Sequence, residues 1–267
     1  CPWTGDGVMA IRDIVQAAAG AGGVNEYVED VFSTYLYTGT GATQTINNGI
    51  DLAGEGGLVW EKSRSVASSH GWIDTVRGTS SALASNSSGA QNTVVASNIT
   101  AFNSNGYTIN SGGDFNTNGA TYASWTFRKA PKFFDVVTWT GTGGVRAISH
   151  NLGSTPGCII VKWYNQADNW TVYHRGLNGG TNPQDYGVYL NSTNAAIDES
   201  GFWNDTEPTS TQFTVGGSLN SSFGGGGQYV AYLFAHDAGG FGDDGLQNVI
   251  SCGTATTNGS GLATVTL

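Results

Sequence analysis

The most informative stretch for the fold occurs twice, first as Tyr122-Ala-Ser-Trp-Thr-Phe127 and again as Tyr229-Val-Ala-Tyr-Leu-Phe234. Both copies are rich in aromatic side chains and are long enough for one β-strand. They lie 107 residues apart. A period of about 100 residues is too long for a solenoid repeat and matches the size of a small domain. The sequence therefore predicts tandem copies of one β-module.

Three further pairs of motifs recur at nearly the same separation, and the small drift in spacing is what loop insertions would produce. The pairs are Tyr37-Thr-Gly-Thr-Gly41 with Trp139-Thr-Gly-Thr-Gly143, Gly57-Leu-Val-Trp-Glu-Lys62 with Gly157-Cys-Ile-Ile-Val-Lys162, and Trp72 and Arg77-Gly78 with Trp170 and Arg175-Gly176. The repetition thus extends over most of the chain.

These repeats divide the chain into four segments. We expect residues 1–30 to form an N-terminal segment, residues 31–133 and 134–246 to form two modules, and residues 247–267 to begin a third, truncated module. Several short strands bounded by Gly, Asn or Pro within about 100 residues are typical of a sandwich or jelly roll. The predicted fold class is all-β, with tandem β-sandwich or jelly-roll modules in a segment of a longer array.

The N-terminal segment contains a predicted helix. Apolar residues between Val8 and Ala18 recur at spacings of three and four, and Gly20 follows as a stop signal. This spacing predicts a short amphipathic helix over residues 8–19. Because so short a helix is unstable alone, it would dock on its own domain or on the symmetry axis of an oligomer.

The charge balance restricts the possible partners. The formal net charge is −10, and Lys and Arg together number only 10. Nucleic acids and anionic membrane surfaces both attract basic faces, so neither is an expected partner. No apolar run approaches the roughly 18–20 residues needed to cross a bilayer, so no membrane insertion is predicted. With 39% hydrophobic and 11% aromatic residues, the chain can form packed cores rather than remain disordered.

Metal binding has one weak candidate. Cys1, Cys158 and Cys252 are too few and too widely spaced for a disulfide framework or a zinc site, and we expect Cys158 to be a buried free thiol. The glycine-rich segment 236–245 contains three carboxylates that could bind calcium. The alternative is a solvated turn. These carboxylates are Asp237, Asp243 and Asp244.

Tryptophan and arginine residues are the candidates for ligand binding. Trp72 with Arg77, and Trp170 with Arg175, could each stack on a sugar ring and bond its hydroxyls. The same pairs could instead be buried tryptophans covered by arginine in a cation–π contact. Trp203 has no aromatic counterpart in the first module and lies among polar residues. Because loops vary while scaffolds repeat, Trp203 is a candidate for surface recognition.

Catalytic motifs are missing. A retaining glycosidase needs two carboxyl groups about 5 Å apart, which on a strand means acids at alternating positions. Asp198 and Glu199 are adjacent instead, and the chain contains no G-x-S-x-G nucleophile elbow. We therefore predict that the protein is not an enzyme.

Six stretches together resemble a repeat of bacteriophage virion proteins. They are residues Phe134–Gly143, Ile148–Gly157, Trp170–Arg175, Tyr189–Thr193, Phe202–Asn204 and Tyr229–Gly245. Such repeats are common in tail-fibre-like and other structural proteins of marine phages. The resemblance runs from about residue 31 to the end and is strongest from Phe134 to Cys252. It implies a module of a virion appendage with a lectin-like β-sandwich fold, and it implies no catalytic residues. Because phage fibres are commonly trimeric, the resemblance also leads us to predict a homotrimer, with the helix over residues 8–19 on its three-fold axis.

Three classes of function therefore stay open. The first is a structural and adhesive module of a virion appendage, which would act as a spacer, contact copies of itself and other virion proteins, and bind host-surface polysaccharide. The second is a carbohydrate-binding module of a secreted or surface bacterial adhesin. The third is a glycan-degrading enzyme. The first class best fits the repeats and places the protein on the virion, outside the cell.

Overall fold

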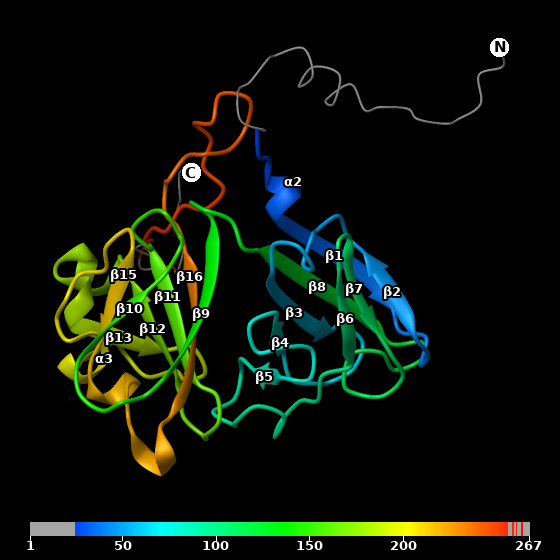
Figure 1. Cartoon of the computed structure of the whole chain (residues 1–267), viewed down its shortest axis with the longest axis horizontal. Helices are drawn as coiled ribbons and strands as arrows, with labels where there is room; N and C mark the ends of the chain where they lie inside the picture. Colours follow the sequence, from blue (N-terminus) through cyan, green and yellow to red (C-terminus); the bar gives the residue numbers. More distant parts are fainter. Residues whose placement is uncertain (1–24, 256–257, 259, 261–262, 264–267) are drawn as a thin grey trace.

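The chain folds into antiparallel β-sheets joined by short helices (Figure 1). The computed structural model describes residues 25–255, 258, 260 and 263. The mostly-β part of the predicted fold class is confirmed. The predicted helix over residues 8–19 and the docking it would provide lie outside the described residues, and both stay predictions. No helix in the described part of the chain combines the length and apolarity needed to span a membrane.

The first half of the described chain contains two sheets. A five-stranded sheet has the order β1-β8-β3-β4-β5, and a three-stranded sheet has the order β2-β7-β6. The elements are α2 (Val28–Val31), β1 (Phe32–Thr38), β2 (Gln44–Asn47), β3 (Gly57–Ser63), β4 (Gly71–Asp74), β5 (Ala82–Ala84), β6 (Ile99–Asn103), β7 (Gly106–Ile109) and β8 (Thr121–Arg128).

The second half also contains two sheets. A six-stranded sheet has the order β14-β13-β12-β11-β16-β9, and a two-stranded sheet pairs β10 with β15. The strands are β9 (Phe134–Thr140), β10 (Arg146–Ser149), β11 (Cys158–Trp163), β12 (Trp170–His174), β13 (Tyr186–Tyr189), β14 (Ile197–Asp198), β15 (Gln212–Val215) and β16 (Gln228–Phe234). The helices are η1 (Leu177–Gly180), η2 (Pro183–Asp185), α3 (Ser200–Trp203), η3 (Gly217–Leu219) and η4 (Phe223–Gly225).

The strand order of the first large sheet recurs in the second. The series β1-β8-β3-β4-β5 corresponds to β9-β16-β11-β12-β13, and β2-β7 corresponds to β10-β15. The register agrees with this correspondence. Leu58 lies opposite Phe127, and Cys158 lies opposite Phe234. The separations of 100 and 107 residues read from the sequence therefore relate equivalent strand positions.

The same register corrects one alignment made from the sequence. Trp72 lies opposite Trp60, whereas Trp170 lies opposite Lys162. Because Lys62 and Lys162 occupy equivalent positions in β3 and β11, the residue equivalent to Trp170 is His70. The two tryptophans are therefore two positions out of register. Their recurrence as a Trp–Arg motif does not reflect equivalent places in the two sheets.

Each half has its own core, drawn from both of its sheets. In the first half, Val59 and Ile73 of the large sheet belong to one cluster with Ile46, Tyr107 and Ile109 of the small sheet. Alternate side chains of a strand point to opposite faces, so these residues mark the inner face of each strand. The finer description of each half as a lectin-like sandwich remains a proposal.

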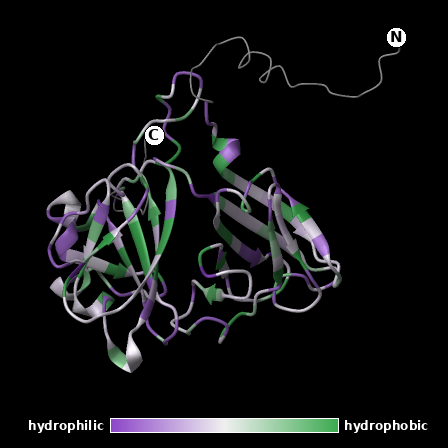
Figure 2. Ribbon diagram, viewed as in Figure 1, coloured by the Kyte–Doolittle hydropathy of each residue, from purple (hydrophilic) through white to green (hydrophobic). Residues whose placement is uncertain are grey.

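The second half is built in the same way. Val161 and Leu233 of its large sheet pack in one cluster with Ile148 of β10 and Phe213 of β15. Figure 2 shows hydrophobic residues on the central strands of this half. Both halves thus bury one face of a large sheet under a small sheet.

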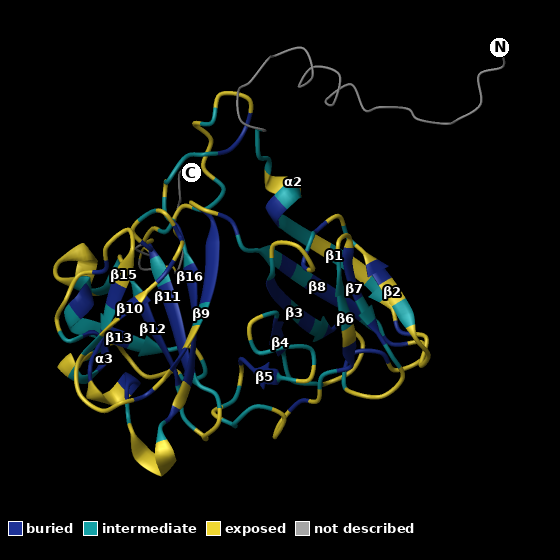
Figure 3. Ribbon diagram, in the orientation of Figure 1, coloured by how far each residue is buried: buried dark blue, intermediate teal, exposed yellow. Residues whose placement is uncertain are grey.

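The outer faces of the two large sheets pack against each other. Along β16, Tyr229, Ala231 and Leu233 belong to the core of the second half, whereas Val230 and Tyr232 belong to a third cluster that also contains Leu58 and Trp72 of the first half. The large sheets are therefore covered on both faces, and their central strands are largely buried (Figure 3). This explains why central strands such as β11 and β16 read as nearly continuous apolar runs.

The interface between the two large sheets is called the junction below. Two equivalent lysines donate hydrogen bonds within the hairpins next to it. The Lys62 Nζ donates to the carbonyl oxygens of Ser63 and Ser68 at 2.9 and 3.1 Å. The Lys162 Nζ donates within its own hairpin, for example to the Asp168 carbonyl at 2.8 Å, and also to the Ser88 carbonyl of the first half at 3.1 Å. Lysine at this repeated position therefore satisfies buried carbonyl groups, and in the second copy it also ties the halves together.

The segment after β16 returns to the junction. Phe241 packs at 6.2 Å from Phe133, and Val249 and Ile250 lie against the same cluster. Within residues 247–255 the structure has no strand. The described part of the expected third module therefore covers the junction between the first two halves, where its apolar side chains find a partner.

Candidate functional site

The repeated tryptophans meet each other at the junction. The rings of Trp72 and Trp170 lie 5.3 Å apart in an edge-to-face contact, and the side chains are 3% and 0% exposed. The Trp170 Nε1 donates to the carbonyls of Ala84 and Ser87 at 3.1 and 3.0 Å. Of the two interpretations made from the sequence, these contacts favour the packing role over sugar stacking for both tryptophans.

Arg77 belongs to a polar network at the same junction. Its Nε donates to Asp74 Oδ2 at 2.7 Å, and its side chain is 2% exposed. The Tyr232 hydroxyl donates to the same carboxylate oxygen at 2.8 Å, and the Arg77 guanidinium lies 5.7 Å from the centre of the Tyr164 ring. Because Asp74 and Tyr232 come from different halves, the network holds the halves in register.

Trp203 is buried, contrary to its predicted place on the surface. It ends the short helix α3 and is 2% exposed. Its Nε1 donates to the Tyr186 carbonyl at 3.1 Å, and its ring contacts Tyr173 edge-on at 5.9 Å. The polar residues that suggested a loop follow the helix, where Asn204 turns the chain with φ of 53°. The helical turn directs both Phe202 and Trp203 into the core, whereas Asp205 after them is exposed.

The three acids of the glycine-rich segment have separate partners. Asp237 lies 3.3 Å from His236, Asp243 accepts from the Tyr27 hydroxyl at 2.5 Å, and Asp244 accepts from the Leu246 backbone N–H at 2.9 Å. In the described part of the chain, no group of three or more His, Cys, Asp or Glu side chains is arranged to hold a metal ion. The structure therefore does not assemble the calcium site proposed from the sequence.

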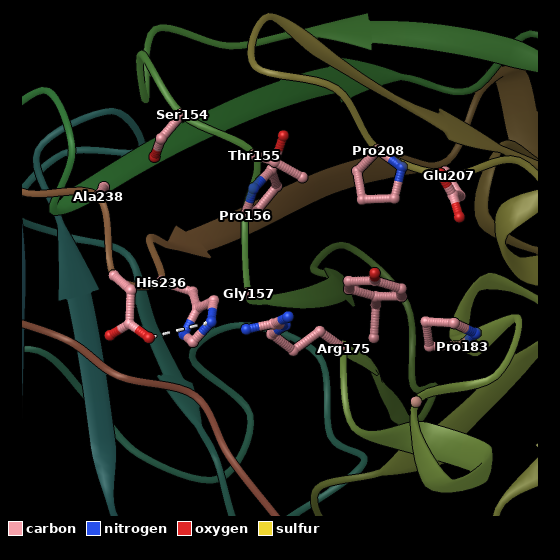
Figure 4. A pocket seen from close by; sticks show the side chains of 13 residues that line it. Ser154, Thr155, Pro156, Gly157, Arg175, Pro183, Glu207, Pro208, His236 and Ala238 are labelled. Carbon is pink, nitrogen blue, oxygen red and sulfur yellow. Dashed lines mark ion pairs between the residues drawn. The ribbon is translucent and has the colours of Figure 1, made fainter. Parts of the chain in front are cut away.

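Two of the predicted site residues, Arg175 and Asp237, line one pocket at the end of the second half. The cavity has a volume of about 460 Å³, within the usual range for small-molecule sites. Its lining is Ser154, Thr155, Pro156, Gly157, Tyr173, Arg175, Gly180, Pro183, Glu207, Pro208, His236, Asp237 and Ala238 (Figure 4). The sequence indicates Arg175 for sugar binding and Asp237 for calcium binding, and it does not predict that they line the same pocket.

The sheet topology explains why these segments converge. Cys158, at the start of β11, lies opposite His174 at the end of β12 and opposite Phe234 at the end of β16. In an antiparallel sheet, the start of one strand and the ends of its two neighbours lie at the same end of the sheet. The loop before β11, the turn after β12 and the segment after β16 therefore surround the same opening.

The histidine of the pocket has a defined tautomer. Its Nδ1 accepts the Cys252 backbone N–H at 3.0 Å, so the hydrogen of neutral His236 lies on Nε2, which faces Asp237 Oδ2 at 3.3 Å. Burial, followed by the charge of Arg175, lowers the pKa of His236 below its ordinary 6.5, although Asp237 opposes this shift. The imidazole is therefore a neutral hydrogen-bond donor at pH 7.

Arg175 is the available cation of the pocket. It is exposed, and its guanidinium extends toward His236 (Figure 4). Among the described residues, its side chain has no hydrogen-bond or ion-pair partner. A guanidinium presents five N–H donors in a planar fork that suits carboxylates and paired oxygens. Arg77, its counterpart in the sequence motif, is buried in an ion pair, so only Arg175 could meet a ligand.

The remaining wall combines apolar and polar groups. Burial, then the nearby Glu207 carboxylate, raises the pKa of Tyr173 to about 12, so its hydroxyl keeps its proton. Glu207 is exposed, and Pro156, Pro183 and Pro208 add rigid apolar surface. This combination of donors, acceptors and flat apolar surface suits a polyhydroxylated ligand. Sequence reasoning did not propose Tyr173, Glu207 or His236 as site residues, because they lie in separate parts of the chain and only the fold brings them to one pocket.

Comparison with known proteins identifies one family. The profile described as Domain of unknown function (DUF7483) matches residues 28–245, which include every strand of both halves. Neither the curated proteins nor the solved structures contain a match to the chain.

Proposed function

The chain belongs to the DUF7483 family, and we propose that it is a structural and adhesive module of a bacteriophage virion appendage, such as a tail fibre or a decoration protein. The observation that carries this proposal is the apolar junction between the two halves. It adds to the resemblance between the sequence and the repeats of virion proteins. The proposed location is the virion, outside the cell.

A spacer must hold the parts that it connects at a fixed separation without bending. Interfaces between domains of one chain are commonly polar and mobile, and a large hydrophobic interface is the exception that restrains motion. Here aromatic rings cross the junction, with Trp72 and Tyr232 at 4.8 Å and Phe127 and Phe234 at 5.6 Å. The buried Arg77–Asp74 pair adds directional bonds. The two halves would therefore act as one stiff unit.

The adhesive part of the proposal rests on the pocket at Arg175. The protein has a net charge of −10, so polyanions would be repelled from most of its surface. The free guanidinium beside the Tyr173 hydroxyl and neutral His236 is a local exception. We propose that this pocket binds a sugar of the host surface, with preference for one that carries a carboxylate.

Glycan binding and turnover test the proposed activity. Wild-type protein should bind an acidic oligosaccharide on an array and in calorimetry without cleaving it. Arg175→Ala should weaken binding at least tenfold, because it removes a charge-assisted contact. Arg64→Ala is the matched control, since Arg64 is exposed and does not line the pocket. Equal affinity of both variants would exclude the pocket, and cleavage of the sugar would favour a glycan-degrading enzyme instead.

The proposed partners are other copies of the chain and other virion proteins. For the full chain we propose a homotrimer, as expected from the helix over residues 8–19. Mass measurement in solution at micromolar concentration should give three chains, and a monomer would contradict the trimer. An image of the intact assembly would distinguish a virion appendage from the alternative, a carbohydrate-binding module of a bacterial adhesin.

A further inference from the structure

A second cavity lies at the junction and shares no residue with the pocket at Arg175. Its volume is about 450 Å³, and its lining is Trp60, His70, Trp72, Ser85, Asn86, Phe127, Ile160, Leu190 and Phe234. We propose that this junction cavity binds a small, planar, neutral molecule that is mainly apolar and carries a hydrogen-bond acceptor. Such a ligand would contact both halves of the protein at once.

The walls of the junction cavity are aromatic and aliphatic. The rings of Trp60 and Trp72 lie 5.4 Å apart on β3 and β4, and Phe127 of β8 meets Phe234 of β16 edge-to-face at 5.6 Å. Ile160 lies on the strand next to β16. Flat rings on several sides favour a planar ligand, because stacked and edge-on contacts both require ring faces.

The second observation concerns the two indole N–H groups of this wall. The Nε1 atoms of Trp60 and Trp72 are buried and have no hydrogen-bond partner among the described residues. By contrast, the buried indoles of Trp139 and Trp203 donate to backbone carbonyls at 3.2 and 3.1 Å. Buried donors are nearly always satisfied in folded proteins. Both unsatisfied donors belong to residues that line the cavity, and ligand binding would turn these rings so that an N–H meets an acceptor atom of the ligand.

The lining also defines the charge of the ligand. None of the lining residues is Lys, Arg, Asp or Glu. A charged ligand would lose its hydration without gaining an opposite charge, which is unfavourable. The polar groups of Asn86 are already engaged, because its Oδ1 accepts the His70 backbone N–H at 3.0 Å and its Nδ2 donates to Ser69 at 3.4 Å. A sugar, with hydroxyls on every side, would find too few partners here.

A neutral acyl-aminonaphthalene fluorophore is a suitable probe, since it is planar, apolar and carries one carbonyl acceptor. We expect saturable binding with a blue-shifted emission and quenching of tryptophan fluorescence. Trp60→Phe keeps an aromatic ring but removes one donor, and should weaken binding about three- to tenfold. Trp125→Phe is the matched control, since its ring lies 5.0 Å from Trp60 but does not line the cavity.

A second variant tests the site without altering the core. Leu190 lines the cavity and is 44% exposed, so Leu190→Trp should narrow the opening and weaken binding at least tenfold while the protein stays folded. Arg175→Ala should leave probe binding unchanged, which separates this site from the proposed glycan pocket. The proposal is overturned if the probe does not bind saturably, if Trp60→Phe and Trp125→Phe behave alike, or if Leu190→Trp binds as wild type does.

Discussion

Replacing Glu61 by glutamine should remove much of the pH dependence of stability between about pH 4.5 and pH 7. Glu61 lies on β3 and is 0% exposed. Its Oε1 lies 2.9 Å from the Tyr37 hydroxyl, which also lies 2.9 Å from the Phe115 carbonyl oxygen. One hydroxyl hydrogen cannot serve both acceptors well. A protonated Glu61 resolves this conflict by donating to Tyr37, which then donates to Phe115.

The magnitude follows from the shift in pKa. Burial raises the pKa of Glu61 from 4.5 to about 7, and the hydrogen bond from Tyr37 offsets only part of this effect. At about 1.4 kcal/mol for each pH unit, the difference amounts to about 3 kcal/mol. Because the folded state holds its proton more tightly, this contribution is fully present below about pH 4.5 and is lost as the pH rises through about 7.

Urea denaturation at a series of pH values measures this effect. Glutamine stays neutral, and its amide N–H can still donate to Tyr37. The Glu61→Gln variant should therefore match wild type near pH 4 and exceed its free energy of unfolding by up to about 3 kcal/mol near pH 8. Histidines titrate in the same window, so the difference between the two proteins is the informative quantity. Exposed Glu207→Gln serves as the control and should follow wild type at every pH.

The reasoning about Glu61 would be refuted by parallel curves. If wild type and Glu61→Gln lose stability equally as the pH rises, Glu61 is ionised in the folded protein at pH 5 and its burial does not hold the proton. A variant that is less stable than wild type near pH 8 would refute it as well, because the carboxylate would then be the favoured form.

Three further predictions concern the junction and the acidic segment. Trp170→Ala should lower the free energy of unfolding by about 3–5 kcal/mol through the cavity it leaves between the halves, as measured by urea denaturation; a change below about 1 kcal/mol would show that the halves are not packed there. Arg77→Met should cost a similar amount, since Asp74 would stay buried without its partner, and adding Asp74→Asn should restore part of the loss. Melting curves with and without a calcium chelator should superimpose, whereas a lower melting temperature in chelator would indicate a calcium site at Asp237, Asp243 or Asp244.

Several features of the fold could be read from the sequence because they depend on local pattern. Strand-forming runs such as Tyr229–Phe234 and the motif that ends in Lys162 repeat at separations that agree with strand register. Continuous apolar runs such as Tyr229–Phe234 are typical of strands that are covered on both faces. The sequence does not show which surface provides the cover, because the side-chain period of two distinguishes the faces without identifying their partners.

The candidate sites depended on tertiary structure. The prediction that Trp203 lies on the surface was wrong, because polar residues next to it in the sequence do not determine whether its own ring points into the core. Arg175 and Glu207 line one pocket only because antiparallel strands bring distant loops to the same end of the second half. Composition and local pattern were enough to predict that the chain is β-rich, repeated and acidic. That the two large sheets cover each other emerged from the fold, since burying both apolar faces requires long-range contacts that no local pattern specifies.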